Sequence, residues 1–198
     1  MSFEEEKKKV LFEYKNALKK GLVDKKIVKI LDLINRNPYY YTTSSCSGRI
    51  SLDIEGNKKK EHFWIFKSHK IIKEKDLKKV LDFALEKNLN NLFLKVDSFI
   101  LHVVCKNLDF AKKILNIAQN LGLKRSGIIQ LDKKILVEIL GLDRLEIPLL
   151  IDKDLVINLN VLDKVVFLVN KKLIRNWERL EIFYLSLKKE LGGGPAGI

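Results

Sequence analysis

The sequence has few of the residues that mark common metal and cofactor sites. It contains two cysteines, Cys46 and Cys105, in 198 residues, and they form no paired-cysteine motif. A zinc site of the usual kind is therefore disfavoured, and no metal is expected. No strand-like segment is followed by the glycine fingerprint of a dinucleotide site or by a phosphate loop with its lysine. These absences argue against a Rossmann-type methyltransferase or dehydrogenase.

The sequence also lacks long apolar runs. None approaches the ~20 residues needed to span a membrane, and the first residues, MSFEEEKKK, are charged. We therefore expect no signal peptide, no membrane association and a cytoplasmic protein with reduced thiols. The last residues, 192–198, read GGGPAGI and are expected to be a flexible tail.

Positive charge is abundant in this chain. The formal net charge is +13, with 46% hydrophobic and 32% charged residues, which is typical of a folded protein. Such an excess favours a polyanionic partner such as RNA or DNA, although lysine-rich surfaces can also serve solubility alone. Nothing in the sequence indicates an obligate protein partner.

Periodicity predicts an α/β (α+β) protein of strand–strand–helix units forming one mixed sheet. Two helices over residues 1–37 precede a sheet region over 39–151, and a long helix or helix pair follows over 158–190. The predicted strands lie at 49–55, 62–70, 91–96, 99–106, 125–131, 134–140 and 145–151. We expect a single domain over 1–191.

One stretch, YYYTTSSCSGRI over 39–50, combines aromatic, hydroxyl, glycine and arginine side chains. Its hydroxyls offer hydrogen-bond donors, Gly48 allows close backbone approach, and Arg49 supplies a forked charge. The stretch can be read as an anion- or nucleotide-binding loop, or as a polar turn before a strand. Cys46 could act as a nucleophile only with a base, and none is nearby in sequence.

The three histidines are in or beside predicted strands. His102 lies within FILHVVC, where a histidine on an apolar strand face often has a structural role. His69 ends its strand in SHK, at the rim of the sheet, where ligands often bind. His62 has the position of an ordinary residue at the start of a strand. Composition therefore leaves open both an enzyme and a non-catalytic basic RNA-binding protein.

Four segments together resemble one family, the tRNA wybutosine-synthesizing protein 3 enzymes. They are YYYTTSSCSGRI (39–50), WIFKSH (64–69), FILHVVC (99–105) and LKRSGI (123–128). The resemblance extends from 19 to 183, with the segments in the family's order. It implies a fold that is not the Rossmann methyltransferase fold, in agreement with the missing glycine fingerprint.

The resemblance implies S-adenosylmethionine-dependent methylation of N-4 in a 4-demethylwyosine-type tricyclic guanosine. That base lies next to the anticodon of tRNA(Phe), so the expected partner is the anticodon stem-loop. The site residues that it implies are Ser44, Ser45, Ser47, Gly48, Arg49, His69, His102, Ser126 and Gly127.

Roles for these residues follow from the chemistry of methyl transfer. His102, or else His69, would accept the proton that N-4 releases. Arg49 would bind the carboxylate of the cofactor or an RNA phosphate, with Ser45 and Ser47 fixing its geometry. Aromatic side chains, either Trp64 or the tyrosines at 39–41, would stack on the base or on adenine, unless they belong to the core.

Overall fold

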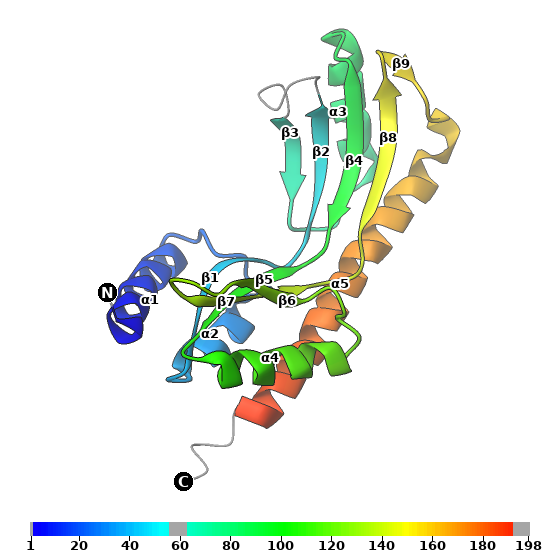
Figure 1. Ribbon diagram of the computed structural model, residues 1–198. Helices are drawn as coiled ribbons and strands as arrows, with labels where there is room; N and C mark the ends of the chain where they lie inside the picture. The colour runs from blue at the N-terminus through cyan, green and yellow to red at the C-terminus, as the bar shows by residue number, and fades with distance from the viewer. Residues whose placement is uncertain (1, 56–62, 192–198) are drawn as a thin grey trace. The chain divides into compact units, whose positions relative to one another are not determined.

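A computed structural model describes residues 2–55 and 63–191, which form two compact units (Figure 1). Of the described residues, the first unit contains those up to Ser47, Phe99–Leu142 and those from Trp177 onward. The second contains Gly48–Ser98 and Asp143–Asn176. The predicted tail, 192–198, and His62 lie outside the described residues.

The first unit has a four-stranded antiparallel sheet in the order β1-β5-β7-β6. Its strands are β1 (Tyr40–Cys46), β5 (Ile100–Cys105), β6 (Gly127–Gln130) and β7 (Ile135–Leu140). Its helices are α1 (Phe3–Lys19), α2 (Val28–Arg36), α4 (Leu108–Asn120) and the C-terminal part of α5 (Leu162–Leu191). Helices α2, α4 and α5 cover one face of the sheet (Figure 1).

The core of this unit lies between that face and the helices. Alternate strand residues such as Leu101 and Val137 are fully buried against Ile30 and Phe183. The residues between them, including His102, therefore point to the opposite face. This alternation separates the hydrophobic core from the face that can receive a ligand.

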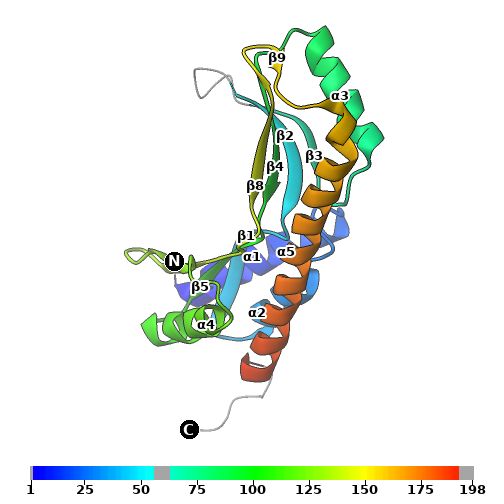
Figure 2. The ribbon, with the colours of Figure 1, turned by 90° about the vertical axis from the view of Figure 1, so that its right-hand side faces the viewer.

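The second unit has a five-stranded antiparallel sheet in the order β3-β2-β4-β8-β9. Its strands are β2 (Arg49–Glu55), β3 (Phe63–Ser68), β4 (Asn91–Asp97), β8 (Leu145–Ile151) and β9 (Asp154–Leu155). Helix α3 (Glu74–Glu86) and the N-terminal part of α5 lie on one face, as Figure 2 shows from the side. Ile50, Leu52 and Leu94 are fully buried on that face.

The helix ends follow from local sequence. Ser2 and Glu5 form a reciprocal capping box at the start of α1. Asp24 accepts a hydrogen bond from the Lys26 amide just before α2, which begins at Val28. The long C-terminal pattern forms one 30-residue helix, α5, preceded by a 3-10 turn at Leu159–Val161.

No helix in 2–55 or 63–191 is long and apolar enough to cross a membrane.

The α+β class, the N-terminal helices, the long C-terminal helix and the absence of a Rossmann fold are confirmed. The prediction of one mixed sheet is wrong, because the strands within 2–55 and 63–191 form two sheets whose ladders are antiparallel. Consecutive strands such as β4 and β5 belong to different sheets. The hydroxyl stretch is also not a loop, since residues 40–46 form β1.

Candidate functional site

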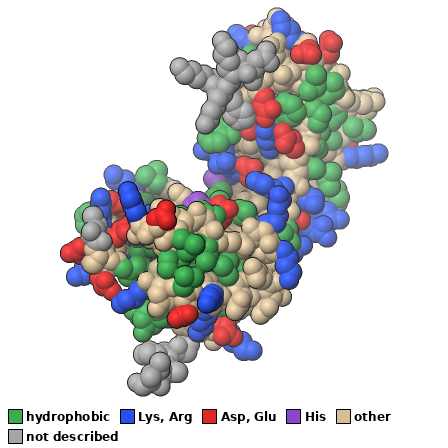
Figure 3. Space-filling view, viewed as in Figure 1, with side chains coloured by type: hydrophobic (Ala, Val, Ile, Leu, Met, Phe, Trp, Pro, Cys, Tyr) green, Lys and Arg blue, Asp and Glu red, His purple; other side chains and the backbone are tan. Residues whose placement is uncertain are grey.

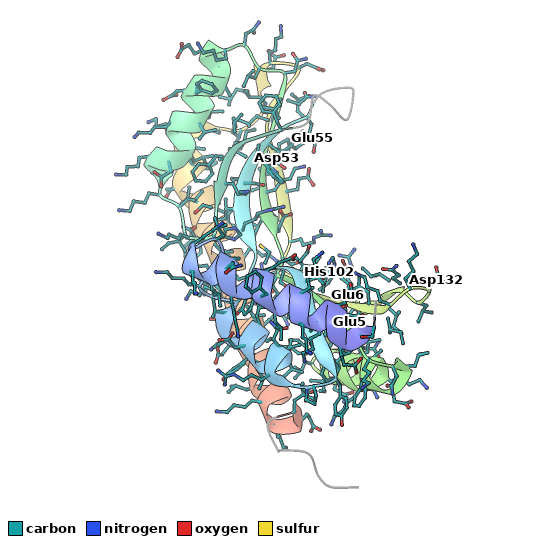
Figure 4. All side chains as sticks on the ribbon, turned by 90° about the vertical axis from the view of Figure 1, so that its left-hand side faces the viewer. Glu5, Glu6, Asp53, Glu55, His102 and Asp132 are labelled. Carbon is teal, nitrogen blue, oxygen red and sulfur yellow. The ribbon has the colours of Figure 1, made fainter. Side chains whose placement is uncertain are left out.

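Three residues form a row across the exposed face of the first unit's sheet. His102 on β5 is paired with Glu138 on β7, and Glu138 is paired with Gly127 on β6. Directly opposed residues of an antiparallel ladder share a face, so the three lie side by side. Figure 4 shows His102 on the side of this sheet away from α2 and α4.

A bulge in β1 adds two hydroxyl residues to this row. The register between β1 and β5 shifts so that Thr43 and Ser44 together oppose His102. Both residues are exposed. Bulges often redirect side chains beside functional sites, and this one places hydroxyl groups next to the histidine.

His102 and Glu138 form a close pair at the centre of the row. The distance from His102 Nε2 to Glu138 Oε2 is 2.9 Å, and the side chains are 21% and 22% exposed. A carboxylate can only accept, so Nε2 carries the proton in this contact and Nδ1 of a neutral ring holds the lone pair. Nδ1 makes no hydrogen bond with the described residues.

The residues at 126–127 leave room beside this pair. Gly127 lies opposite Glu138, and a Cβ atom added to it would meet no atom within 4 Å. Ser126 is buried, and its Oγ accepts a hydrogen bond from the amide of Leu140 at 3.1 Å. Ser126 thus fixes the start of β6, and Gly127 leaves space at the end of the row.

The other predicted serines of the first unit are internal. Ser45 is paired with the core residue Leu101, and its buried Oγ has no hydrogen-bond partner among the described residues. Ser47 is fully buried, and both its amide and its hydroxyl donate to Asp24. These contacts hold the chain in place just before Gly48.

The remaining predicted residues gather at one end of the second unit's sheet. Strand β2 begins there with Arg49, β3 ends there at Ser68, and β4 ends there at Asp97. The antiparallel register brings these ends together, because Arg49 is paired with Asp97 and Ile50 with Ser68. Gly48 and His69 flank this group.

Arg49 is held on two sides. Its Nε donates to Asp97 Oδ2 at 2.8 Å, and its guanidinium carbon lies 4.7 Å from the centre of the Trp64 ring. The terminal nitrogens make no hydrogen bond with the described residues. They remain as donors in a planar fork of the kind that suits carboxylates and phosphates.

Gly48 occupies a backbone conformation that other residues rarely adopt. Its φ is +95°, and a Cβ atom would lie 2.9 Å from the Asp97 carbonyl oxygen. That same atom would lie 3.5 Å from the Asn176 side chain. Glycine is therefore required here by conformation and by packing.

His69 is oriented by the Gly48 carbonyl. The distance between its Nδ1 and that oxygen is 2.9 Å. Because a carbonyl only accepts, Nδ1 carries the proton, and Nε2 of a neutral ring holds the lone pair.

Sequence reasoning missed the carboxylates that orient Arg49 and His102. Glu138 lies in a predicted strand, but its pairing with His102 depends on a register that periodicity does not give. It also missed a network on β4, where Lys95 contacts Asp53, Glu55 and Glu146. Burial by itself would lower the pKa of Lys95, but its hydrogen bonds to Glu55 and Glu146 outweigh this effect and raise the pKa.

The aromatic candidates differ in exposure. Tyr40 and Tyr41 are fully buried, and Tyr39 stacks on Phe110 with ring centres 4.0 Å apart. Trp64 is 49% exposed. Tyr40 and Tyr41 therefore belong to the core, whereas Tyr39 is 37% exposed but already stacks on Phe110. Trp64 is the best placed of the four for stacking on a ligand.

The cysteines are both unoxidised in the structure. Cys105 is buried, and burial raises the pKa of its thiol to about 12. A thiol in this state is a poor nucleophile at neutral pH. Cys46 lies at the end of β1 and is partly buried.

Comparison with known proteins gives consistent matches over nearly the whole chain. The family model described as "Methyltransferase TYW3" matches residues 5–189. A Thermococcus sibiricus protein named tRNA(Phe) 7-((3-amino-3-carboxypropyl)-4-demethylwyosine(37)-N(4))-methyltransferase is 40% identical over 90% of this chain and 91% of its own. A Methanocaldococcus jannaschii protein of the same name is 35% identical over 91% and 94%.

Solved structures agree with these matches. A protein of Pyrococcus horikoshii has a TM-score of 0.83 and 33% identity, covering 94% of this chain and 96% of its own. A hypothetical protein from Aeropyrum pernix has a TM-score of 0.73 and 29% identity, covering 84% and 98%.

Proposed function

The chain belongs to the TYW3 methyltransferase family, and from this premise we propose the reaction that it catalyses. A methyl group passes from S-adenosylmethionine to N-4 of a 4-demethylwyosine-type base in tRNA(Phe). The relatives' names specify the base with a 3-amino-3-carboxypropyl group. The observation that carries the proposal is the family match over residues 5–189. It favours an enzyme over a non-catalytic RNA-binding protein.

His102 is the proposed proton acceptor. It lies on the exposed sheet face, and Glu138 fixes the proton on Nε2, which leaves the lone pair of Nδ1 for the substrate. The neighbouring carboxylate also stabilises the imidazolium that forms when Nδ1 takes a proton. His69 is the second candidate, because the Gly48 carbonyl orients it in the same manner through the opposite nitrogen.

The proposed step balances without a further reactant. Nδ1 of His102 would accept the proton that N-4 loses as it gains the methyl group, and the sulfonium would leave as a neutral thioether that keeps the bonding electron pair. S-adenosylmethionine would supply an electrophilic methyl group on a sulfonium. The protein's main contribution is to position N-4 and to accept its proton.

Each unit by itself offers exposed groups of the kind that such a methyl donor binds. The terminal nitrogens of Arg49 suit the carboxylate of its amino-acid part, or alternatively an RNA phosphate. Ser44 offers an exposed hydroxyl beside His102, and Gly127 leaves open space in the same row. Ser45, Ser47, Ser126 and Gly48 support these groups from within, and we assign them positioning roles.

The tRNA contacts are proposed to be largely electrostatic. Lys and Arg side chains are visible on both units in Figure 3, and the chain carries a formal charge of +13. Phosphate contacts of this kind weaken steeply as salt concentration rises. We propose the anticodon stem-loop as the bound part of tRNA(Phe), and a cytoplasmic reaction, as the tRNA-modifying relatives suggest.

The test replaces His102 and Arg49 separately by Ala and measures methylation of tRNA(Phe) by mass analysis of its nucleosides. His102→Ala is expected to lower kcat by about 100-fold or more. Arg49→Ala is expected to raise the KM for the methyl donor or the tRNA. Gln119→Ala, an exposed and uncharged change on α4, is the control. Undiminished methylation by both folded variants would refute the site assignment.

Calorimetry separates the enzyme from the RNA-binding alternative. Titration of the protein with S-adenosylmethionine should release or absorb heat with a saturable profile. An RNA-binding protein with no methyl-transfer role should bind tRNA and give no such profile.

A further inference from the structure

The second unit's sheet has a face that its helices do not cover. Figure 4 shows Asp53 and Glu55 projecting from β2 on the side away from α3. Register places Trp64 of β3 opposite Asp53, and Lys67 opposite Ser51, on this same face. Large aromatic side chains are usually buried, yet Trp64 is 49% exposed here.

Two cations contact the Trp64 ring. The guanidinium carbon of Arg49 lies 4.7 Å from the ring centre, and Lys67 Nζ lies 4.8 Å from it. Such contacts orient the indole and place positive charge beside an exposed aromatic surface. The residue as a whole remains 49% exposed despite both contacts.

Negative charge on this face is concentrated toward β4 and β8. Lys95 contacts Asp53 at 3.7 Å, Glu146 at 3.1 Å and also Glu55, and Asp53 is 4% exposed. The acids are therefore compensated by a cation of their own. A polyanion would be repelled less at the β2–β3 side, where Trp64 and Lys67 are accessible.

We propose that Trp64 and Lys67 form a platform for single-stranded RNA, on which an unpaired base of the tRNA loop stacks. This inference rests on the proposed tRNA substrate, and it identifies Trp64 and Lys67 as the surface that binds the unpaired bases of the tRNA loop. The base would stack on the exposed indole, and Lys67 would contact the adjoining phosphate. Loops offer such unstacked bases, whereas duplex stems do not.

The expected contribution follows from known stacking energies. Stacking of a base on an aromatic side chain contributes about 1–3 kcal/mol, so loss of the indole should weaken loop binding by roughly tenfold. Loss of a phosphate contact in Lys67→Ala should instead make binding less dependent on salt. The slope of log K against log salt concentration should become smaller by about one.

Phe63 provides a matched control for Trp64. It is the neighbouring residue on β3 and is 48% exposed, but it points to the other face. If general loss of exposed aromatic surface were responsible for weaker binding, Phe63→Ala and Trp64→Ala would behave alike. The platform predicts that they differ.

The experiment measures binding of the full chain to a synthetic, unmodified anticodon stem-loop and to a blunt duplex of the same stem, by fluorescence anisotropy. Trp64→Ala should weaken loop binding about tenfold and leave duplex binding unchanged, while Trp64→Phe should stay within about threefold of wild type. Phe63→Ala should match wild type on both probes. Circular dichroism verifies that each variant is folded.

Equal loop binding by Trp64→Ala and wild type would overturn the platform. Equal weakening on loop and duplex would also overturn it, because the contact would then not read single-stranded bases. Failure of the proposed reaction is recognised separately, since it would appear as absent methylation by wild type even with normal loop binding.

Discussion

Replacement of Gly48 by alanine tests the backbone geometry on which the second unit's cluster depends. At φ +95° an L-residue is strained, at a cost of about 1–2 kcal/mol. The added Cβ atom would lie 2.9 Å from the Asp97 carbonyl oxygen, which belongs to the backbone and cannot move aside cheaply. This overpacking contributes about 1–2 kcal/mol more. The expected loss of unfolding free energy is therefore about 2–4 kcal/mol.

Two other glycines allow the conformational cost and the overpacking cost to be measured separately. Gly122 has φ +81° with open space around a Cβ atom, so Gly122→Ala reports the conformational cost alone. Gly127 has open space and no positive φ, so Gly127→Ala should leave stability nearly unchanged. The expected order of destabilisation is Gly48→Ala, then Gly122→Ala, then Gly127→Ala.

Thermal unfolding followed by circular dichroism provides the assay. For a chain of this size each 1 kcal/mol lowers Tm by about 2–4 °C, so Gly48→Ala should lower it by roughly 5–15 °C. The Gly48 carbonyl also orients His69, so the variant should lose activity even below its Tm. A Tm for Gly48→Ala equal to that of Gly122→Ala would show that the close approach to Asp97 is not present.

Three further predictions concern charge and protonation. Lys95→Met should lower the unfolding free energy by about 3 kcal/mol because Asp53, Glu55 and Glu146 lose the cation that they share, whereas Lys87→Met, at an exposed pair, should change it by less than about 1 kcal/mol in denaturant titrations. The raised pKa of Cys105 means that the folded protein keeps a proton that the unfolded chain loses. Stability from this group should thus be complete below pH 9 and fall as pH rises toward 12, and Cys105→Ala should reduce that fall. Glu138→Gln should lower kcat and leave the KM for tRNA unchanged, because it removes the charge that stabilises the imidazolium of His102; a changed KM with constant kcat would contradict the positioning role.

Much of the fold could be predicted because its elements have strong periodicity. The apolar spacing of α5 and the alternation along β2 give both elements directly. The conformation of the hydroxyl stretch at 39–50 was harder to predict, since serine and threonine favour turns when tertiary contacts are not considered. Pairing of β1 with β5, which fixes Tyr40 opposite Cys105, overrides that preference and makes the stretch a strand.

The candidate site could be predicted in part. His102 and Arg49 belong to motifs that sequence reasoning identified, and the structure places both on accessible faces. Their partners Glu138 and Asp97 could not be found, because each is brought into place by ladder register between strands far apart in sequence. The division into two sheets was missed for the same reason.

The most direct test of the central claim is methyl transfer by the purified chain. The protein is incubated with tRNA(Phe) that carries the 4-demethylwyosine-type base and with S-adenosylmethionine labelled in its methyl group, and the nucleosides are analysed by mass spectrometry. The account predicts one labelled methyl group on N-4 of that base, with much slower labelling by His102→Ala. No label on the base, or a label on another atom, would contradict it.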